Sequence, residues 1–172
     1  MTAIKNSILL LGSILLLASY MGCEKDDICL ADTPATPTLV LGFFDIDNPE
    51  VLKDPGNLSI RPVGIDTLLF ASGTIQLDLR TDQEFTEFEF ILNEGNSETE
   101  NTDRIQIHYD REDVYINRAC GYRARFQLKT TAVVITQDEN NWIKDFIRIE
   151  PNIDFIQPGT NEETTIHLGL LH

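Results

Sequence analysis

Apolar and polar side chains alternate along most of the chain from residue 38 onward. The alternation is clearest in the segment 120–129. Every second residue of this segment is apolar or aromatic: Cys120, Tyr122, Ala124, Phe126 and Leu128. The same period of two recurs in the segments 75–79, 87–92 and 105–109. A period of two places one face of a strand in a core and the other face in water. These segments are therefore predicted to be strands, and no long window of the sequence has the period of a helix.

Six further segments have the composition of strands and are separated by turn-forming residues. They are 39–46, 58–63, 67–71, 131–136, 143–150 and 164–170. Leu39–Phe44 is apolar on both parities except at Gly42, so we expect it to lie centrally and to be covered on both sides. Short strands at this spacing predict an all-β domain over residues 38–172: a single antiparallel β-sandwich of immunoglobulin-like or similar type.

The first 22 residues have the pattern of a secretory signal peptide. Lys5 precedes an apolar run from Ile8 to Leu17 that is broken only by Gly12 and Ser13, and charge returns at Glu24. A membrane-spanning helix needs about 20 apolar residues, and this run is shorter. An uncleaved N-terminal anchor helix is the alternative.

The signal segment ends at a glycine and a cysteine, which is the pattern of a lipoprotein signal. Cleavage between Gly22 and Cys23 would leave Cys23 at the new N-terminus, where its thiol becomes a diacylglycerol thioether. Tyr20 and Met21 depart from the usual residues before such a site, a Leu and a small residue. We expect residues 23–37 to form a lipidated tether, because the prolines of its ADTPATP segment favour extended backbone.

Two cysteines remain once Cys23 is assigned to the lipid. An oxidising envelope favours a disulfide between Cys29 and Cys120. Such a bond requires the two Cα atoms to lie about 4.4 to 6.8 Å apart, and it would tie the tether to the domain. Two unrelated thiols are the alternative, because sequence alone does not fix connectivity.

Three segments resemble an uncharacterised Bacteroidetes lipoprotein family, the domain of unknown function 6452. They are CEKDDICLADTPATPTLVLGFFDIDNP at 23–49, NLSI at 57–60 and CGYRARFQL at 120–128. The residues Glu24–Asp27 also resemble the lysine-plus-acid signal that sends Bacteroidetes lipoproteins to the cell surface. The resemblance implies a lipid anchor in the outer membrane, at the cell surface or alternatively on the periplasmic face. It implies no known activity.

The chain is strongly acidic. Its formal net charge is −15, and removal of residues 1–22 takes away Lys5 and no acid, which leaves 12 basic against 28 acidic residues and a charge of −16. Such a surface repels nucleic acid and anionic lipid headgroups. We expect no nucleic-acid partner.

Motifs that would indicate catalysis or a cofactor do not occur in the sequence. There is no Gly-x-Ser-x-Gly elbow, no glycine-rich phosphate loop and no CxxC pair. His108, His167 and His172 lack the spacing that brings two imidazoles to one metal. We therefore predict no catalytic residue and no cofactor.

A cluster of oxygen-bearing side chains is a weak candidate for a calcium site. It consists of Asp45, Asp47, Asn48 and Glu50. The sixth position of an EF-hand loop requires glycine, and Glu50 occupies it. Asx residues that leave a strand before a proline also form ordinary turns, and this alternative is favoured. Asp110, Glu112 and Asp113 form a second acidic group, which we expect at a hairpin turn.

Three cations lie on the polar face that is predicted for the segment 120–129. Arg123, Arg125 and Lys129 could together grip a carboxylate or a sulfated glycan, or contact a partner. The favoured alternative is cross-strand pairing with acids such as Glu87 and Glu89.

Two classes of function follow from these patterns. The first is a non-enzymatic envelope lipoprotein that binds a partner protein or glycan, or acts as an accessory subunit. The second is a surface hydrolase that uses carboxylates. A binding protein should show an exposed apolar patch or open groove. An enzyme should show a deep pocket with convergent polar groups and perturbed acids.

Overall fold

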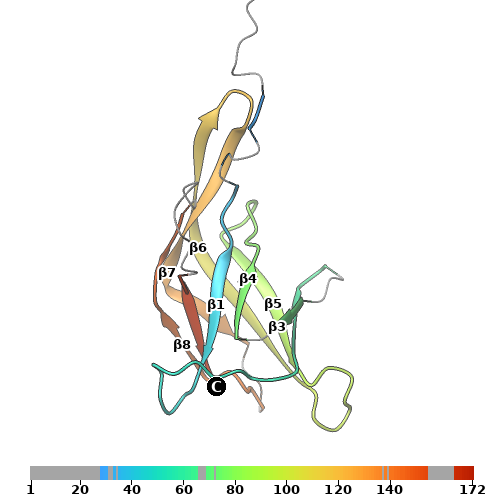
Figure 1. Cartoon of the computed structure of the whole chain (residues 1–172). Coiled ribbons are helices and arrows are strands. Elements are labelled where there is room, and N and C mark those ends of the chain that lie inside the picture. Colours follow the sequence, from blue (N-terminus) through green and yellow to red (C-terminus); the bar gives the residue numbers. More distant parts are fainter. Residues whose placement is uncertain are drawn as a thin grey trace, which may run out of the picture.

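The computed structural model of the chain is built entirely from strands in the part that it describes (Figure 1). That part comprises residues 28–30, 33, 35–65, 69–71, 73–136, 138, 140–154 and 165–172. The predicted signal peptide, Cys23 and Glu24–Asp27 lie outside the described residues. Within those ranges no helix is long and apolar enough to cross a membrane.

The first sheet has four strands in the order β4-β1-β10-β8. Their bounds are Thr74–Leu77 (β4), Leu39–Phe44 (β1), Leu168–Leu171 (β10) and Asp145–Arg148 (β8). β1 and β10 pair in parallel, whereas the other two pairs are antiparallel. The expectation of a purely antiparallel fold is wrong at this pair. Strands so far apart in the chain are not joined by a hairpin, so no turn forces them to be antiparallel.

The second sheet has six strands in the order β3-β2-β5-β6-β7-β9, and all its pairs are antiparallel. Their bounds are Leu69–Ala71 (β3), Leu58–Pro62 (β2), Phe85–Leu92 (β5), Asn101–Asn117 (β6), Gly121–Ile135 (β7) and Asn152–Ile153 (β9). β7 unites two predicted strands, 120–128 and 131–136. The register shifts from Ile107 opposite Val133 to Tyr109 opposite Leu128, which leaves residues 129–132 as a bulge.

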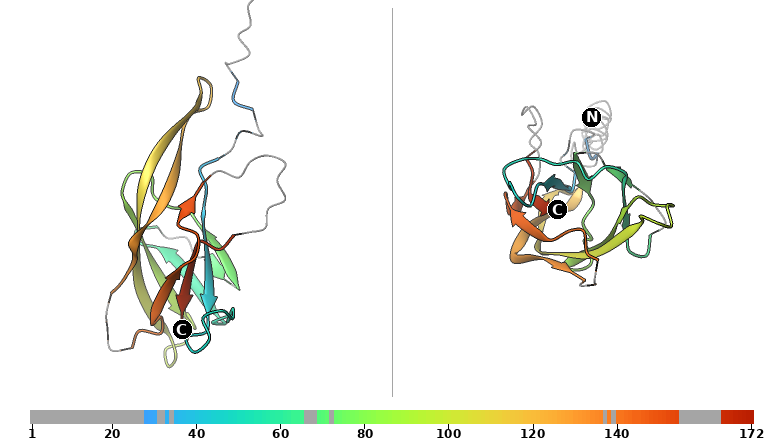
Figure 2. Two further views of the ribbon diagram at one scale, coloured as in Figure 1. Left: turned by 90° about the vertical axis from the view of Figure 1, so that its left-hand side faces the viewer. Right: turned by 90° about the horizontal axis from the view of Figure 1, so that it is seen from below.

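The two sheets share one hydrophobic core and form two layers (Figure 2). Phe43 of β1 lies 6.4 Å, between ring centroids, from Phe90 of β5 in the opposite sheet. Leu39, Leu41 and Phe43 of β1 are buried and belong to this core. Val40 and Phe44 on the other parity are buried as well. The central position predicted for this strand is thus confirmed.

Two glycines allow side chains to pack closely on the outer face of β1 and β10. Gly42 and Gly169 are partners in the parallel ladder. A Cβ atom at Gly169 would lie 2.6 Å from Cγ1 of Ile147 and 2.8 Å from the Phe44 ring. The absence of a side chain at Gly169 therefore lets Phe44 cover this face.

The β6–β7 hairpin extends beyond the rest of the fold, at the end opposite the C-terminus (Figures 1 and 2). The β5–β6 register ends at Phe85 opposite His108, and the β7–β9 register ends at Phe126 opposite Ile153. Among the described strands, residues 111–125 pair only within the hairpin, and we call this segment the ribbon. Asp110, Glu112 and Asp113 lie in β6 and not in a turn, so that prediction is wrong; the turn is at 118–120.

Candidate functional site

The tether is covalently joined to the end of the ribbon. Cys29 and Cys120 form a disulfide with a Cα–Cα distance of 4.8 Å, which confirms the predicted pair. Four residues beyond the turn cysteine, the Ala124 amide donates to Thr36 Oγ1 at 3.4 Å. The segment that follows Cys29 is therefore held against β7. Lipidation of Cys23 stays a prediction, because Cys23 lies outside the described residues.

Two of the three cations of the predicted basic face are bound to acids of the same chain. Arg125 lies 2.7 Å from Glu112 and 3.6 Å from Asp154. Lys129 lies 2.7 Å from Glu84, and the hydrogen bond between them is the main cause that raises the pKa of Lys129. The Arg125–Glu112 pair is the cross-strand ion pair of the favoured alternative, whereas Glu84 lies just before β5.

The acids in these pairs differ from the ones expected. Glu87 and Glu89 contact Arg104 of β6, at 3.8 and 2.6 Å. The third cation, Arg123, points back to the turn and donates to the carbonyl oxygens of Cys120 and Tyr122. The structure therefore does not unite the three cations around one anion site.

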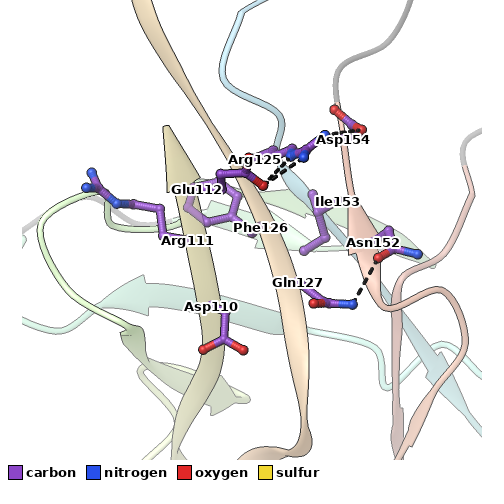
Figure 3. A pocket seen from close by; sticks show the side chains of 9 residues that line it. All are labelled: Asp110, Arg111, Glu112, Arg125, Phe126, Gln127, Asn152, Ile153 and Asp154. Carbon is purple, nitrogen blue, oxygen red and sulfur yellow. Dashed lines mark hydrogen bonds and ion pairs between the residues drawn. The ribbon is translucent and has the colours of Figure 1, made fainter. Parts of the chain in front are cut away.

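A cavity of about 350 Å³ lies beside the Arg125 pairs (Figure 3). Phe126 and Ile153 contribute its apolar lining. Each carboxylate that lines it contacts a cation: Asp110 contacts Lys129, and Glu112 and Asp154 contact Arg125. Carboxylate catalysis needs one carboxyl group to act as acid and another as base or nucleophile. The three carboxylates of this cavity are therefore each engaged in an ion pair.

The predicted calcium ligands form a turn. Asp45 Oδ1 accepts from the Asp47 amide at 2.9 Å, and Asp45 lies 3.6 Å from Lys53. The backbone hydrogen bond from Asp47 is the main cause that lowers the pKa of Asp45. This is the Asx turn named as the alternative. The described part of the chain contains no group of three or more His, Cys, Asp or Glu side chains placed to hold a metal ion.

An apolar groove of about 730 Å³ lies between the turn after β2, the β3 strand and the segment 78–87. Its apolar lining consists of Pro62, Val63, Ile65, Leu69, Leu79 and Phe85. Its polar lining consists of Asp78, Arg80, Gln83, Thr86 and Glu87. The sequence does not indicate this groove, because its lining comes from segments that only the fold brings together.

A buried hydrogen-bond network fixes one wall of the groove. Tyr109 donates its hydroxyl to the Arg80 carbonyl at 2.8 Å and lies 2.7 Å from Thr86 Oγ1. The Arg80 amide donates to the same Thr86 oxygen at 2.8 Å. Burial raises the pKa of Tyr109, so the phenol remains neutral and can donate. The groove therefore has a wall that is formed before any ligand binds.

Comparison with known proteins identifies the family. The model of a family of unknown function (DUF6452) matches residues 57–168, more than half of the chain. The chain belongs to this family. The DUF6452 match extends from the residue before β2 to the first residue of β10, and it includes the ribbon and the groove. The segments NLSI and CGYRARFQL lie inside the match, and the segment 23–49 lies before it. No curated protein and no solved structure matches the chain.

Proposed function

We propose that this DUF6452 protein is a lipid-anchored lipoprotein of the outer membrane of a Bacteroidetes bacterium, exposed at the cell surface, which acts without catalysis by binding a partner. The observation that supports the location is the Cys29–Cys120 disulfide, because such bonds persist in oxidising compartments and are rare in the cytosol. The pattern of residues 1–23 supports the anchor. The two-layer packing supports an immunoglobulin-like sandwich as the finer description of the fold.

The apolar groove is the binding site in this proposal. Binding sites are typically concave and mostly apolar, with a few polar groups that fix orientation. The groove has this composition, with six apolar residues and a hydrogen-bonded wall. Five of the six are aliphatic or proline, and Phe85 is the one aromatic side chain in the lining. This composition favours apolar side chains of a partner protein over a glycan.

The hydrolase alternative receives less support from the same residues. The carboxylates of the groove lining are Asp78 and Glu87, and Glu87 contacts Arg104 at 3.8 Å. Two carboxylates that face one scissile bond would be expected at a hydrolytic site. Glu87 is thus engaged by a cation and most of the lining is apolar, so binding without chemistry is the function that the lining fits.

A charge placed in the groove tests the proposal. Ile65 lines the groove and is 56% exposed, so Ile65→Asp adds a charge without opening the core. Ile149 follows β8 in the other sheet and is 46% exposed, and Ile149→Asp is the matched control. Each variant is expressed in the native host, cross-linked at the cell surface and purified, and the captured envelope proteins are quantified.

We expect Ile65→Asp to reduce the captured partner by about tenfold or more, because burial of an unpaired charge costs more than the 1.4 kcal/mol that a tenfold change requires. The control should capture the wild-type amount. Equal capture by all three proteins would contradict binding in the groove, and turnover of a surface glycan by the wild type would favour the hydrolase.

A further inference from the structure

The end of the ribbon exposes a pair of aromatic side chains. Tyr115 of β6 and Tyr122 of β7 lie opposite each other, with ring centroids 5.3 Å apart. Their exposed fractions are 56% and 64%. Ile28 and Leu30, on either side of Cys29, are also exposed. Because Cys29 is bonded to Cys120, these four side chains gather at one end of the molecule, and we call them the tip cluster.

The ribbon has a charge unlike that of the rest of the chain. Residues 114–124 include Arg118 and Arg123 and no acidic residue, in a chain whose formal net charge is −15. The described part of the chain leaves the tyrosine pair of the ribbon more than half exposed. An exposed tyrosine pair at such a position is more stable where its rings leave water.

The tip cluster lies close to the proposed lipid anchor. Cys29 lies six positions after Cys23, and a fully extended chain of this length spans at most about 22 Å. Because Cys120 is bonded to Cys29, Cys120 and the end of the ribbon that carries it also lie within a limited distance of Cys23. In Figures 1 and 2 the ribbon and residues 28–30 lie at the end opposite the C-terminus. If Cys23 is embedded in lipid, the tip cluster is the part of the described molecule that lies nearest to the membrane.

We propose that the tip cluster inserts into the headgroup layer of the membrane that holds the anchor. Tyrosine suits this layer, because its ring is apolar and its hydroxyl can remain hydrated. Residues 114–124 of the ribbon carry two arginines and no acid, so the charge of this part suits the anionic phosphates of lipids. The acidic body is not a barrier, because salt screens charges beyond about 8 to 10 Å and the ribbon holds the body away. This inference rests on the proposed lipid anchor, and it gives the domain one orientation on the membrane.

The test uses a mature protein, residues 23–172, with its disulfide intact. Cys23 is then the one free thiol, and it is coupled to maleimide lipid in vesicles of phosphatidylethanolamine and phosphatidylglycerol. In a Trp142→Phe background, which removes the one native tryptophan, Tyr122→Trp and, separately, Tyr115→Trp place a fluorescent reporter in the tip cluster. Ile149→Trp places the same reporter beyond β8 as a control. Emission is recorded with lipids brominated in their acyl chains, and with iodide in the water.

We expect both tip reporters to shift to the blue on coupling, to be quenched by brominated lipid and to lose their quenching by iodide. The control reporter should keep its iodide quenching. Tip reporters that remain open to iodide and insensitive to bromine would overturn the inference. So would protection from iodide before vesicles are added, because a second copy of the chain would then cover the tip.

The two proposals fail in different ways. A native protein without acyl groups on Cys23 would contradict the proposed anchor, whereas the vesicle result does not depend on native acylation. A natively acylated protein whose tip reporters stay in water would contradict the tip insertion alone.

Discussion

At the scale of single residues, Asp103 is the least expected feature of the core. It belongs to β6 and is fully buried. Its Oδ2 atom accepts from the Ile143 amide at 2.7 Å, which fixes the loop between β7 and β8. Burial is the main cause that raises the pKa of this carboxyl group. Burial of the charge of Asp103 is unfavourable, whereas the hydrogen bond that Asp103 accepts holds the loop in place.

Two substitutions separate the charge of Asp103 from its hydrogen bond. Asp103→Ala leaves the Ile143 amide without its acceptor, so we expect a loss of about 1 to 3 kcal/mol in the free energy of unfolding. Asp103→Asn keeps an acceptor for the Ile143 amide and removes the charge, but it places an amide group where the buried Oδ1 atom has no hydrogen-bond partner, so we expect it to lose less stability than Asp103→Ala. Urea unfolding of the three proteins measures this, and an Asn variant as unstable as the Ala variant would contradict the assignment.

The direction of the pKa shift of Asp103 also predicts how the stabilities of the wild type and of Asp103→Asn depend on pH. A buried acid with a raised pKa binds its proton at a higher pH when folded than when unfolded, so the wild type becomes more stable as the pH falls through that window. The free energy of unfolding of Asp103→Asn, relative to that of the wild type, should therefore fall as the pH approaches 4. If the relative stability of Asp103→Asn rose on acidification, this would contradict the raised pKa of Asp103.

His167 gives the opposite pH dependence. Its Nδ1 atom accepts from the Val40 amide at 2.8 Å, and burial is the main cause that lowers its pKa. The unfolded chain then binds the proton first, so this residue lowers stability as the pH falls below about 6.5. His167→Asn keeps an acceptor and does not titrate. We expect its stability to fall less than that of the wild type between pH 7 and pH 5, and equal losses would contradict this role.

At the scale of elements, the sequence predicted most strands because their surroundings are simple. Where one face meets the core and the other meets water, as in β5 and residues 123–128 of β7, the period of two locates the strand. The prediction fails in residues 110–117 of β6, where neither face is buried and a polar residue no longer indicates a turn. Asp110, Glu112 and Asp113 were for this reason assigned to a turn instead of β6.

The long-range features were not accessible to the sequence pattern. The parallel pairing of β1 and β10 depends on two strands from opposite ends of the domain. The groove likewise depends on the approach of β3 to the segment 78–87. The acids that pair with Arg125 and Lys129 were misassigned for the same reason, because strand order decides which charges meet. The disulfide was predictable because only two cysteines remained to pair.

Removal of the disulfide should affect the ribbon more than the body. Replacement of Cys29 and Cys120 by serine removes a crosslink across 91 residues, which contributes at most roughly 4 to 5 kcal/mol in the chain-entropy model. We expect faster amide exchange in residues 111–125, because the ribbon loses its disulfide to the tether. The β5–β6 ladder, which does not depend on this disulfide, should remain. Uniform acceleration in both regions, measured by hydrogen exchange, would contradict a local role for the bond.

At the scale of the whole molecule, the proposals place function at two different regions. The ribbon and the disulfide lie next to the proposed anchor, while the groove is formed by β3, the turn after β2 and the segment 78–87. An anchor of this kind attaches the protein to the membrane without spanning it. The negative charge of the body favours solubility at a crowded surface. In this account the ribbon orients the domain and leaves the groove to the partner.

The mass of the intact protein, extracted from native membranes without reduction, tests the central claim most directly. The account predicts a chain that begins at Cys23, carries the added mass of a diacylglycerol thioether and lacks the two hydrogens of a Cys29–Cys120 disulfide. A protein recovered with Met1 in place, no acyl group and free thiols would contradict the account.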